Sequence, residues 1–281
     1  MSPTSPGAAM PKTSQKTAAY ERLGVAIAGQ GEPVVLLHGS MSSKAQWNTL
    51  AQQLARRFRV VAFDLQGYGD NRAAIGLQSF PIDDEVDFLV ARLDDVIGAR
   101  AAHVVGHSYG GLVAMRLAQR FPERVSSLVL YEPMALSLLA GDSVAAPAHE
   151  AGLAITALVN KHCQYEAAQV CIDFWSEPGA FAALPLPVKA RLAAGAPQTA
   201  LNYQAEVSCP LTLEDLRSIW APTLLLGGAR SPACMQRIVR ILAETLPNSR
   251  MNWLITNHTG PVSAAALVNP WIKSFLEINA A

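Results

Sequence analysis

A five-residue turn, Gly106-His107-Ser108-Tyr109-Gly110, has the spacing G-x-S-x-G that can make a serine hydroxyl a nucleophile. A serine hydroxyl attacks a carbonyl only when a base takes its proton, so the side chain must project toward a histidine. A sharp turn between a strand and a helix achieves this, and its glycines let neighbouring backbone come close. The helix that follows directs its first amides at developing negative charge. The turn therefore predicts Ser108 as a nucleophile.

Apolar strands and helical patterns flank this turn and recur along the chain. AAHVVGHS at 101–108 is an apolar run typical of a strand buried on both faces of a sheet, and YGGLVAMRLAQRF at 109–121 is typical of a helix. We expect further strands at 20–29, 34–39, 59–65, 125–133, 222–228 and 250–256, and helices after residue 47, at 82–98, at 232–247 and from about 263. Repeated strand–helix units predict an α/β fold, with a mostly parallel central sheet and helices on both faces.

This alternation stops between residues 134 and 215, which are Ala-rich and helical in pattern. Open α/β sheets bind ligands at the carboxyl ends of their strands, so we interpret 134–215 as a helical cap or lid insertion over those ends. An extra helical layer without a ligand role is the alternative. Residues 18–133 and 216–281 then form the core. Residues 1–17, rich in Pro, Ser, Thr and Ala, are expected to be a disordered tail.

Composition excludes several classes of partner. The 281 residues contain 22 Lys and Arg against 22 Asp and Glu, a balance that attracts neither nucleic acid nor an anionic membrane. A hydrophobic content of 51% with 16% charged residues is the reverse of a disordered composition. No secretory signal or membrane-spanning run is visible, so we expect a cytoplasmic protein with a small-molecule substrate and no indicated oligomeric state. The four cysteines lack metal-binding spacing, so we expect buried thiols and no metal or cofactor, with a Cys163–Cys171 bridge left open for an exported protein.

Four short stretches follow predicted strands or precede predicted helices: His38-Gly39-Ser40, Asp64 to Gly69, Gly106 to Gly111, and Asn257 to Pro261. In these residues and in their order, the chain from 34 to about 275 resembles the α/β-hydrolase fold. The resemblance is to lid-bearing serine esterases, perhydrolases and C–C hydrolases. The match to the fold is specific, whereas no single activity within that group is indicated.

The resemblance implies a role for each polar group. It implies Ser108 as nucleophile, His258 as general base, and the backbone N–H groups of Ser40 and Tyr109 as donors to an oxyanion. The positions of the histidines support this independently. Of the six in the chain, only His258 combines a loop position with the order nucleophile-then-histidine.

The acid that orients the histidine in this family is missing from its usual place. That place follows the penultimate strand, where Ser231 stands in the loop after Gly228. A neutral serine cannot offset the charge of an imidazolium. We predict Glu132 as the replacement, because it ends the strand after the turn helix and some relatives with this fold carry their acid there. A Ser–His pair without a carboxylate and a degenerate site both remain open.

Together these residues predict a cofactor-independent serine hydrolase acting on a small, mainly apolar ester, thioester or lactone. We expect Met41, and Phe174 and Trp175 in the insertion, to line the substrate pocket, and from these side chains we infer a preference for apolar substrates. One alternative is a non-hydrolytic ligand-binding protein or degenerate enzyme, which the missing acid favours. Another is a perhydrolase or C–C hydrolase with the same Ser–His groups. Epoxide or haloalkane hydrolysis is disfavoured, since it needs a carboxylate where Ser108 stands.

Overall fold

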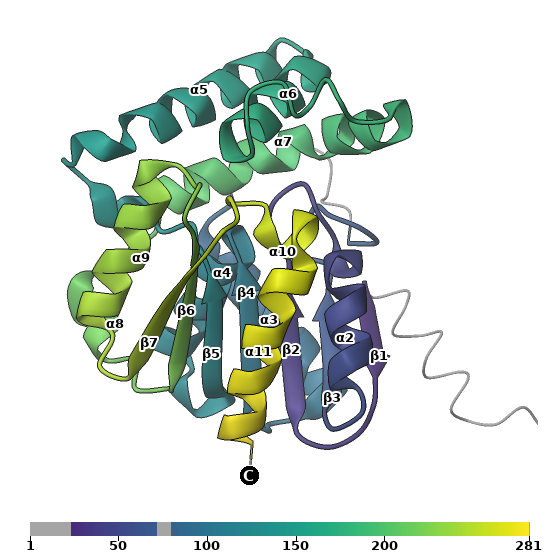
Figure 1. The fold of residues 1–281 in the computed structure, drawn as a ribbon, viewed down its shortest axis with the longest axis vertical. Helices are drawn as coiled ribbons and strands as arrows, with labels where there is room; N and C mark the ends of the chain where they lie inside the picture. Colours follow the sequence, from purple (N-terminus) through teal and green to yellow (C-terminus); the bar gives the residue numbers. More distant parts are fainter. Residues whose placement is uncertain (1–23, 72–79, 281) are drawn as a thin grey trace, which may run out of the picture.

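A central sheet organises the protein, as Figure 1 shows for a computed structural model that describes residues 24–71 and 80–280. The expected tail, 1–17, and the first residues of the strand expected at 20–29 lie outside these ranges. The described strands form one seven-stranded sheet in the order β1-β3-β2-β4-β5-β6-β7. β1 pairs antiparallel with β3, and the other neighbouring strands are parallel. The predicted mostly parallel α/β sheet is therefore confirmed.

The strands agree with the apolar runs in the sequence. Every residue of β2, β4 and β6 is buried, which explains why these strands read as continuous apolar stretches rather than as alternating ones. The strand bounds are β1 Val25–Ala28, β2 Pro33–Leu37, β3 Arg59–Phe63, β4 Ala102–His107, β5 Val125–Tyr131, β6 Thr223–Gly228 and β7 Ser249–Leu254.

Helices cover both faces of the sheet. α2 and α11 pack on one face, and α3, α4 and α9 pack on the other, each group sharing a hydrophobic cluster with the strands beneath it (Figure 1). The bounds of these and the shorter helices are α2 Asn48–Leu54, α3 Ile82–Ile97, α4 Tyr109–Arg120, α8 Leu213–Arg217, α9 Ala233–Thr245, α10 Gly260–Ser263 and α11 Ala265–Asn279. Within the described ranges, four 3₁₀ turns complete this set, at Lys44–Trp47, Pro122–Arg124, Leu136–Leu139 and Ser143–Ala145.

Three further helices, which we call the α5–α7 layer, lie across the carboxyl ends of the parallel strands (Figure 1). They are α5 Ala146–Asn160, α6 Gln164–Trp175 and α7 Leu186–Ser208. Their small side chains bring them close together around a separate hydrophobic cluster that includes Ala167, Ala168 and Ala196. Met41, from the loop after β2, belongs to the same cluster, so the layer packs directly on a loop of the sheet. No strand interrupts the described chain between β5 and β6.

Several further features bear on the sequence predictions. All four cysteines are free thiols, so Cys163 and Cys171 form no bridge. Among the described residues, no group of three or more His, Cys, Asp and Glu side chains is arranged to hold a metal ion. A search of the same residues for a helix with the length and hydropathy of a membrane span found none.

Candidate active site

Ser108 lies at the junction of β4 and α4 in a strained backbone conformation. Its φ of 53° is in the left-handed region, which a non-glycine residue rarely adopts. Glycine is required on both sides, because a Cβ atom on Gly106 would overlap backbone of α4 and one on Gly110 would overlap backbone at the end of β2. The Ser108 N–H donates to the Tyr131 carbonyl at 3.1 Å, which fixes the turn against β5. This packing holds the serine side chain at the sheet edge beneath the α5–α7 layer.

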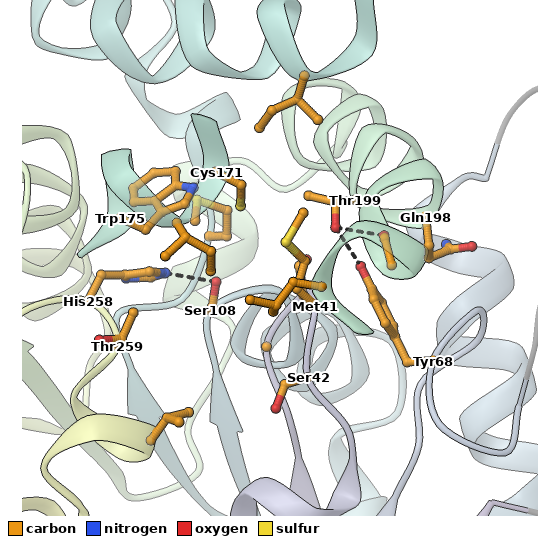
Figure 2. A pocket seen from close by; sticks show the side chains of 18 of the residues that line it. Met41, Ser42, Tyr68, Ser108, Cys171, Trp175, Gln198, Thr199, His258 and Thr259 are labelled. Atoms are coloured by element: carbon orange, nitrogen blue, oxygen red, sulfur yellow. Dashed lines mark hydrogen bonds between the residues drawn. The ribbon is translucent and has the colours of Figure 1, made fainter. Parts of the chain in front are cut away.

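Three buried side chains form a continuous hydrogen-bonded chain at this edge. His258 Nε2 lies 2.9 Å from Ser108 Oγ, and His258 Nδ1 lies 2.8 Å from Glu132 Oε2 (the Ser108–His258 bond is drawn in Figure 2). The exposed fractions are 5% for Ser108, 4% for His258 and 0% for Glu132. Because an ionised carboxylate only accepts hydrogen bonds, Nδ1 carries the proton and Nε2 is left to accept from the serine hydroxyl. This is the tautomer in which an imidazole can remove the serine proton.

Glu132 is held by two donors besides His258. The Gly228 N–H donates to Oε1 at 2.6 Å, and the Ser231 hydroxyl donates to Oε2 at 2.9 Å. Glu132 has a φ of 42°, so its backbone is also in the left-handed region, directly after β5. The serine that stands in the usual acid position therefore contacts the carboxylate that the sequence analysis predicted from the neighbouring strand.

The loop that carries His258 is anchored by residues at the ends of β4 and β5. The Tyr131 hydroxyl donates to the Asn257 carbonyl at 2.8 Å, and His107 Nε2 lies 2.9 Å from the His258 carbonyl oxygen. Burial, with His258 nearby, holds the pKa of His107 well below its usual value, so this ring is neutral and donates from Nε2. The Trp175 ring packs against the His258 ring, with a distance of 4.8 Å between ring centroids.

The two residues predicted to supply oxyanion donors are Tyr109, which follows the serine directly, and Ser40, which lines the same cavity as Ser108. Tyr109 is the first residue of α4, so its N–H has no acceptor within the helix. Ser40 follows Gly39, on which a Cβ would lie 3.1 Å from the Ser108 Cβ. His38 fixes this loop: its Nε2 accepts from the Leu65 N–H at 3.0 Å, and its Nδ1 donates to the Gly39 carbonyl at 2.7 Å. Burial lowers the pKa of His38 to about 4, which keeps the ring neutral in this role.

A cavity of about 1250 Å³ opens above Ser108, between the sheet edge and the α5–α7 layer. Figure 2 shows Ser108, His258, Trp175 and Met41 around it. Most of its lining is apolar and comes from both the loops of the sheet and the three helices. Of the three predicted pocket residues, Met41 and Trp175 line the cavity and Phe174 does not. Phe174 packs edge-on against Trp175 and on the core beneath.

Residues 32–260 match the family model described as alpha/beta hydrolase fold. The chain belongs to the alpha/beta hydrolase family. A pimeloyl-[acyl-carrier protein] methyl ester esterase from Aeromonas hydrophila is 30% identical over 79% of this chain and 86% of its own. A 2-hydroxy-6-oxo-2,4-heptadienoate hydrolase from Pseudomonas putida is 36% identical over 39% of this chain and 40% of its own. Among solved structures, a thermophilic esterase from Thermogutta terrifontis has a TM-score of 0.76 at 23% identity, covering 92% of this chain and 93% of its own.

These findings confirm the resemblance and the fold class predicted from the sequence, and they show that the protein is a hydrolase. The alpha/beta hydrolase carries Ser108 after β4, Glu132 after the adjacent β5 and His258 after β7, all at the carboxyl ends of parallel strands of one sheet. The catalytic roles of these residues remain predictions, as do the boundaries proposed for the insertion.

Sequence reasoning missed several contacts that position the site of this hydrolase. The Tyr68 hydroxyl binds Thr199 Oγ1 and Asn202 Oδ1, both at 3.1 Å, and so ties a loop of the sheet to α7 (Figure 2 shows the Thr199 bond). Partners more than 130 residues apart leave no local pattern in the sequence. The anchoring role of Tyr131 was missed for the same reason, whereas Ser231 was noticed and only its partner was unknown.

Proposed function

We propose that this hydrolase cleaves a mainly apolar ester, thioester or lactone through an acyl-enzyme on Ser108. The observation that carries the proposal is the hydrogen-bonded chain from Ser108 through His258 to Glu132, which opens on a largely apolar cavity. The cavity of about 1250 Å³ is larger than the roughly 300–1,000 Å³ common for small-ligand pockets, so it has room for more than a short acyl group.

In the first step, Ser108 Oγ attacks the substrate carbonyl carbon while His258 Nε2 takes the hydroxyl proton. The carbonyl oxygen becomes an oxyanion, and the N–H groups of Ser40 and Tyr109 would donate to it. The resulting imidazolium carries a positive charge, which the Glu132 carboxylate stabilises through Nδ1–H. His258 then gives its proton to the leaving alcohol or thiol, which departs and leaves the acyl group on Ser108.

In the second step, a water molecule takes the place of the leaving group. His258 accepts a proton from this water, whose oxygen attacks the acyl carbon. The second oxyanion collapses, the bond to Ser108 Oγ breaks, and the proton on His258 returns to the serine. The products are a carboxylic acid and the regenerated enzyme. The leaving group carries away the original serine proton, and a proton from the water restores the serine hydroxyl.

Chain-length panels of p-nitrophenyl esters test this proposal. We expect wild-type protein to release p-nitrophenol, with the highest kcat/KM on acyl chains long enough to fill the apolar cavity. Ser108→Ala is expected to lose at least about 10³-fold in kcat, because it removes the Oγ atom on which the acyl-enzyme forms. Equal rates for wild type and Ser108→Ala would contradict the proposal.

A second candidate is hydrolysis of a carbon–carbon bond next to a ketone, favoured by the similarity to the 2-hydroxy-6-oxo-2,4-heptadienoate hydrolase. The same serine, histidine and oxyanion donors would serve, and the departing carbon would take the proton that His258 removed from Ser108. Incubation with that dienoate and measurement of its loss by absorbance separates the candidates. Loss of the dienoate without ester cleavage would favour the carbon–carbon hydrolase over the esterase.

A further inference from the structure

One carboxyl group facing the cavity has no partner within the described parts of the chain. Glu206, near the end of α7, lines the cavity and is only 6% exposed. No hydrogen bond or ion pair of its side chain is found among residues 24–71 and 80–280, and burial alone accounts for the shift of its pKa. Arg191 carries the only permanent positive charge among the described lining residues, and it is exposed to solvent. A buried carboxyl group without a partner is costly, so its presence calls for an explanation.

The other polar side chains on the same stretch of α7 are less available to a molecule in the cavity. Thr199 and Asn202 Oδ1 bind the Tyr68 hydroxyl, and the Tyr203 hydroxyl lies 3.1 Å from His149 Nδ1. The Asn202 amide nitrogen has no partner in the described structure, but Asn202 is fully buried and does not line the cavity. Gln198 has an amide nitrogen without a partner in the described structure, but Figure 2 shows it on the side of α7 away from Ser108. Glu206 is therefore the side chain of α7 that remains available to a molecule inside the cavity.

The surroundings of Glu206 indicate the kind of group it would bind. Burial raises its pKa to about 8, so at neutral pH it holds its proton and is an uncharged carboxylic acid. Burial raises the pKa of the Cys171 thiol, which lines the same cavity, to about 12, and the ionised form of Glu206 would add to this shift. Glu206 also contributes, after burial and other neighbours, to the raised pKa of Tyr109, the residue next to Ser108. A neutral carboxyl group in apolar surroundings matches a neutral hydrogen-bonding group better than an ion.

We propose that Glu206 binds an uncharged hydroxyl group on the part of an otherwise apolar substrate chain that lies against α7. This inference rests on the proposed function and narrows its substrate class to esters or lactones of hydroxylated acyl chains. A protonated carboxyl group can donate to the hydroxyl oxygen and accept from the hydroxyl proton at the same time. A site with a buried hydrogen-bonding group discriminates against the analogue that lacks the matching hydroxyl, because the protein group is then left unpaired.

Paired substrates and a matched pair of variants test the proposal. The substrates are p-nitrophenyl esters whose acyl chains have four to eight carbons and end in a methyl, a hydroxyl or an ammonium group. The measured quantity is kcat/KM for the hydroxyl-terminated ester divided by kcat/KM for the methyl-terminated ester. At the best chain length we expect Glu206→Leu to lower this ratio roughly ten- to a hundredfold. Glu206→Gln, which keeps a donor and an acceptor, is expected to retain most of it.

Glu85 provides the control, because it is a second buried carboxyl group whose pKa burial raises to about 8, and it lies outside the cavity lining. Glu85→Gln should leave the hydroxyl-to-methyl ratio unchanged. An unchanged ratio in Glu206→Leu overturns the inference. A preference for the ammonium ester that is lost in Glu206→Gln also overturns it, since that result identifies a cation site.

A binding measurement separates this inference from the proposed function. In Ser108→Ala, which cannot form the acyl-enzyme, calorimetry compares 1,8-octanediol with 1-octanol. We expect the diol to bind more tightly, and we expect Glu206→Leu in the same background to remove the difference. If the diol preference is present while wild type cleaves no ester, the proposed function fails alone. If esters are cleaved and neither readout depends on Glu206, this inference fails alone.

Discussion

The sheet edge and the α5–α7 layer face each other across the cavity and differ in how their polar groups are satisfied. At the sheet edge, Ser108, His258 and Glu132 bind one another, and Gly228 and Ser231 hold the carboxylate. On the opposite side, the lining of the layer is mostly apolar and Glu206 has no partner among the described residues. A network in which every polar group has a hydrogen-bond partner is held in one geometry, whereas a polar group without a partner is available to bind a ligand. We therefore expect substitutions at the sheet edge to change kcat and those in the layer to change selectivity.

Among substitutions that leave the nucleophile in place, the largest expected effect is at Glu132. Glu132→Gln removes the charge that stabilises the imidazolium and can present an N–H where His258 needs an acceptor. We expect kcat to fall about 10²- to 10⁴-fold with little change in KM. Steady-state kinetics on the best p-nitrophenyl ester measure this. Activity within threefold of wild type would show that a Ser–His pair suffices without this carboxylate.

A smaller loss is expected for Ser231→Ala. Glu132 keeps its bonds to Gly228 and His258, so only one of three donors is lost. We expect kcat to fall roughly tenfold, in line with the loss of one hydrogen bond to a charged group. The informative control is Ser231→Asp in the Glu132→Gln background, which returns a carboxylate to the usual acid position. Recovery of part of the lost kcat would show that the two strand ends present an acid to the same histidine.

Two adjacent residues of α6 test the other side of the cavity. Trp175 lines it and covers His258, whereas Phe174 packs on the core and lies outside the lining. We expect Trp175→Leu to raise KM for apolar esters severalfold, and Phe174→Leu to lower the melting temperature without changing the chain-length preference. Kinetics over the ester panel and thermal unfolding check both. A changed chain-length preference in Phe174→Leu, with none in Trp175→Leu, would contradict the conclusion that Trp175 lines the cavity and Phe174 does not.

The smallest expected effect is a pH dependence of stability from His38. Its pKa is about 4 in the folded protein against an ordinary 6.5, so the unfolded chain binds more protons between these values. The contribution of a neutral His38 is complete above pH 6.5 and is lost as pH falls toward 4, by about 3 kcal/mol for a shift of this size. His38→Gln should show a shallower fall in the free energy of unfolding over that window. Chemical denaturation at several pH values measures it, and equal slopes would contradict the buried neutral role.

The sequence predicted the fold because buried parallel strands appear as short apolar runs that need no knowledge of their partners. The sequence made Glu132 the leading candidate for the acid that orients His258, but it could not establish this role. A sequence pattern places a residue at the end of a strand and does not show which strand ends lie together. The register supplies the reason: Tyr131 pairs with Leu226, so Glu132 lies beside the loop after Gly228. Ser231 in that loop binds the Glu132 carboxylate, and Glu132 itself binds His258.

Predictions for the α5–α7 layer were weaker for a physical reason. Successive residues of a helix point about 100° apart, so the sequence could not separate the cavity-facing Trp175 from Phe174 without knowing how α6 packs. Glu206 also carried no signal, since an acid in a helix is ordinarily exposed. Only the packing of α7 over the sheet reveals that this carboxyl group is buried at the cavity.

Covalent labelling of the nucleophile tests the central claim most directly. A fluorophosphonate reacts with a serine only when a base activates it, and the adduct adds a defined mass to one peptide. We predict a single adduct on the peptide that contains Ser108, formed rapidly in wild type, slowly in Glu132→Gln and not at all in Ser108→Ala. An intact, folded wild-type protein that takes up no label, or that is labelled at another serine, would contradict the account.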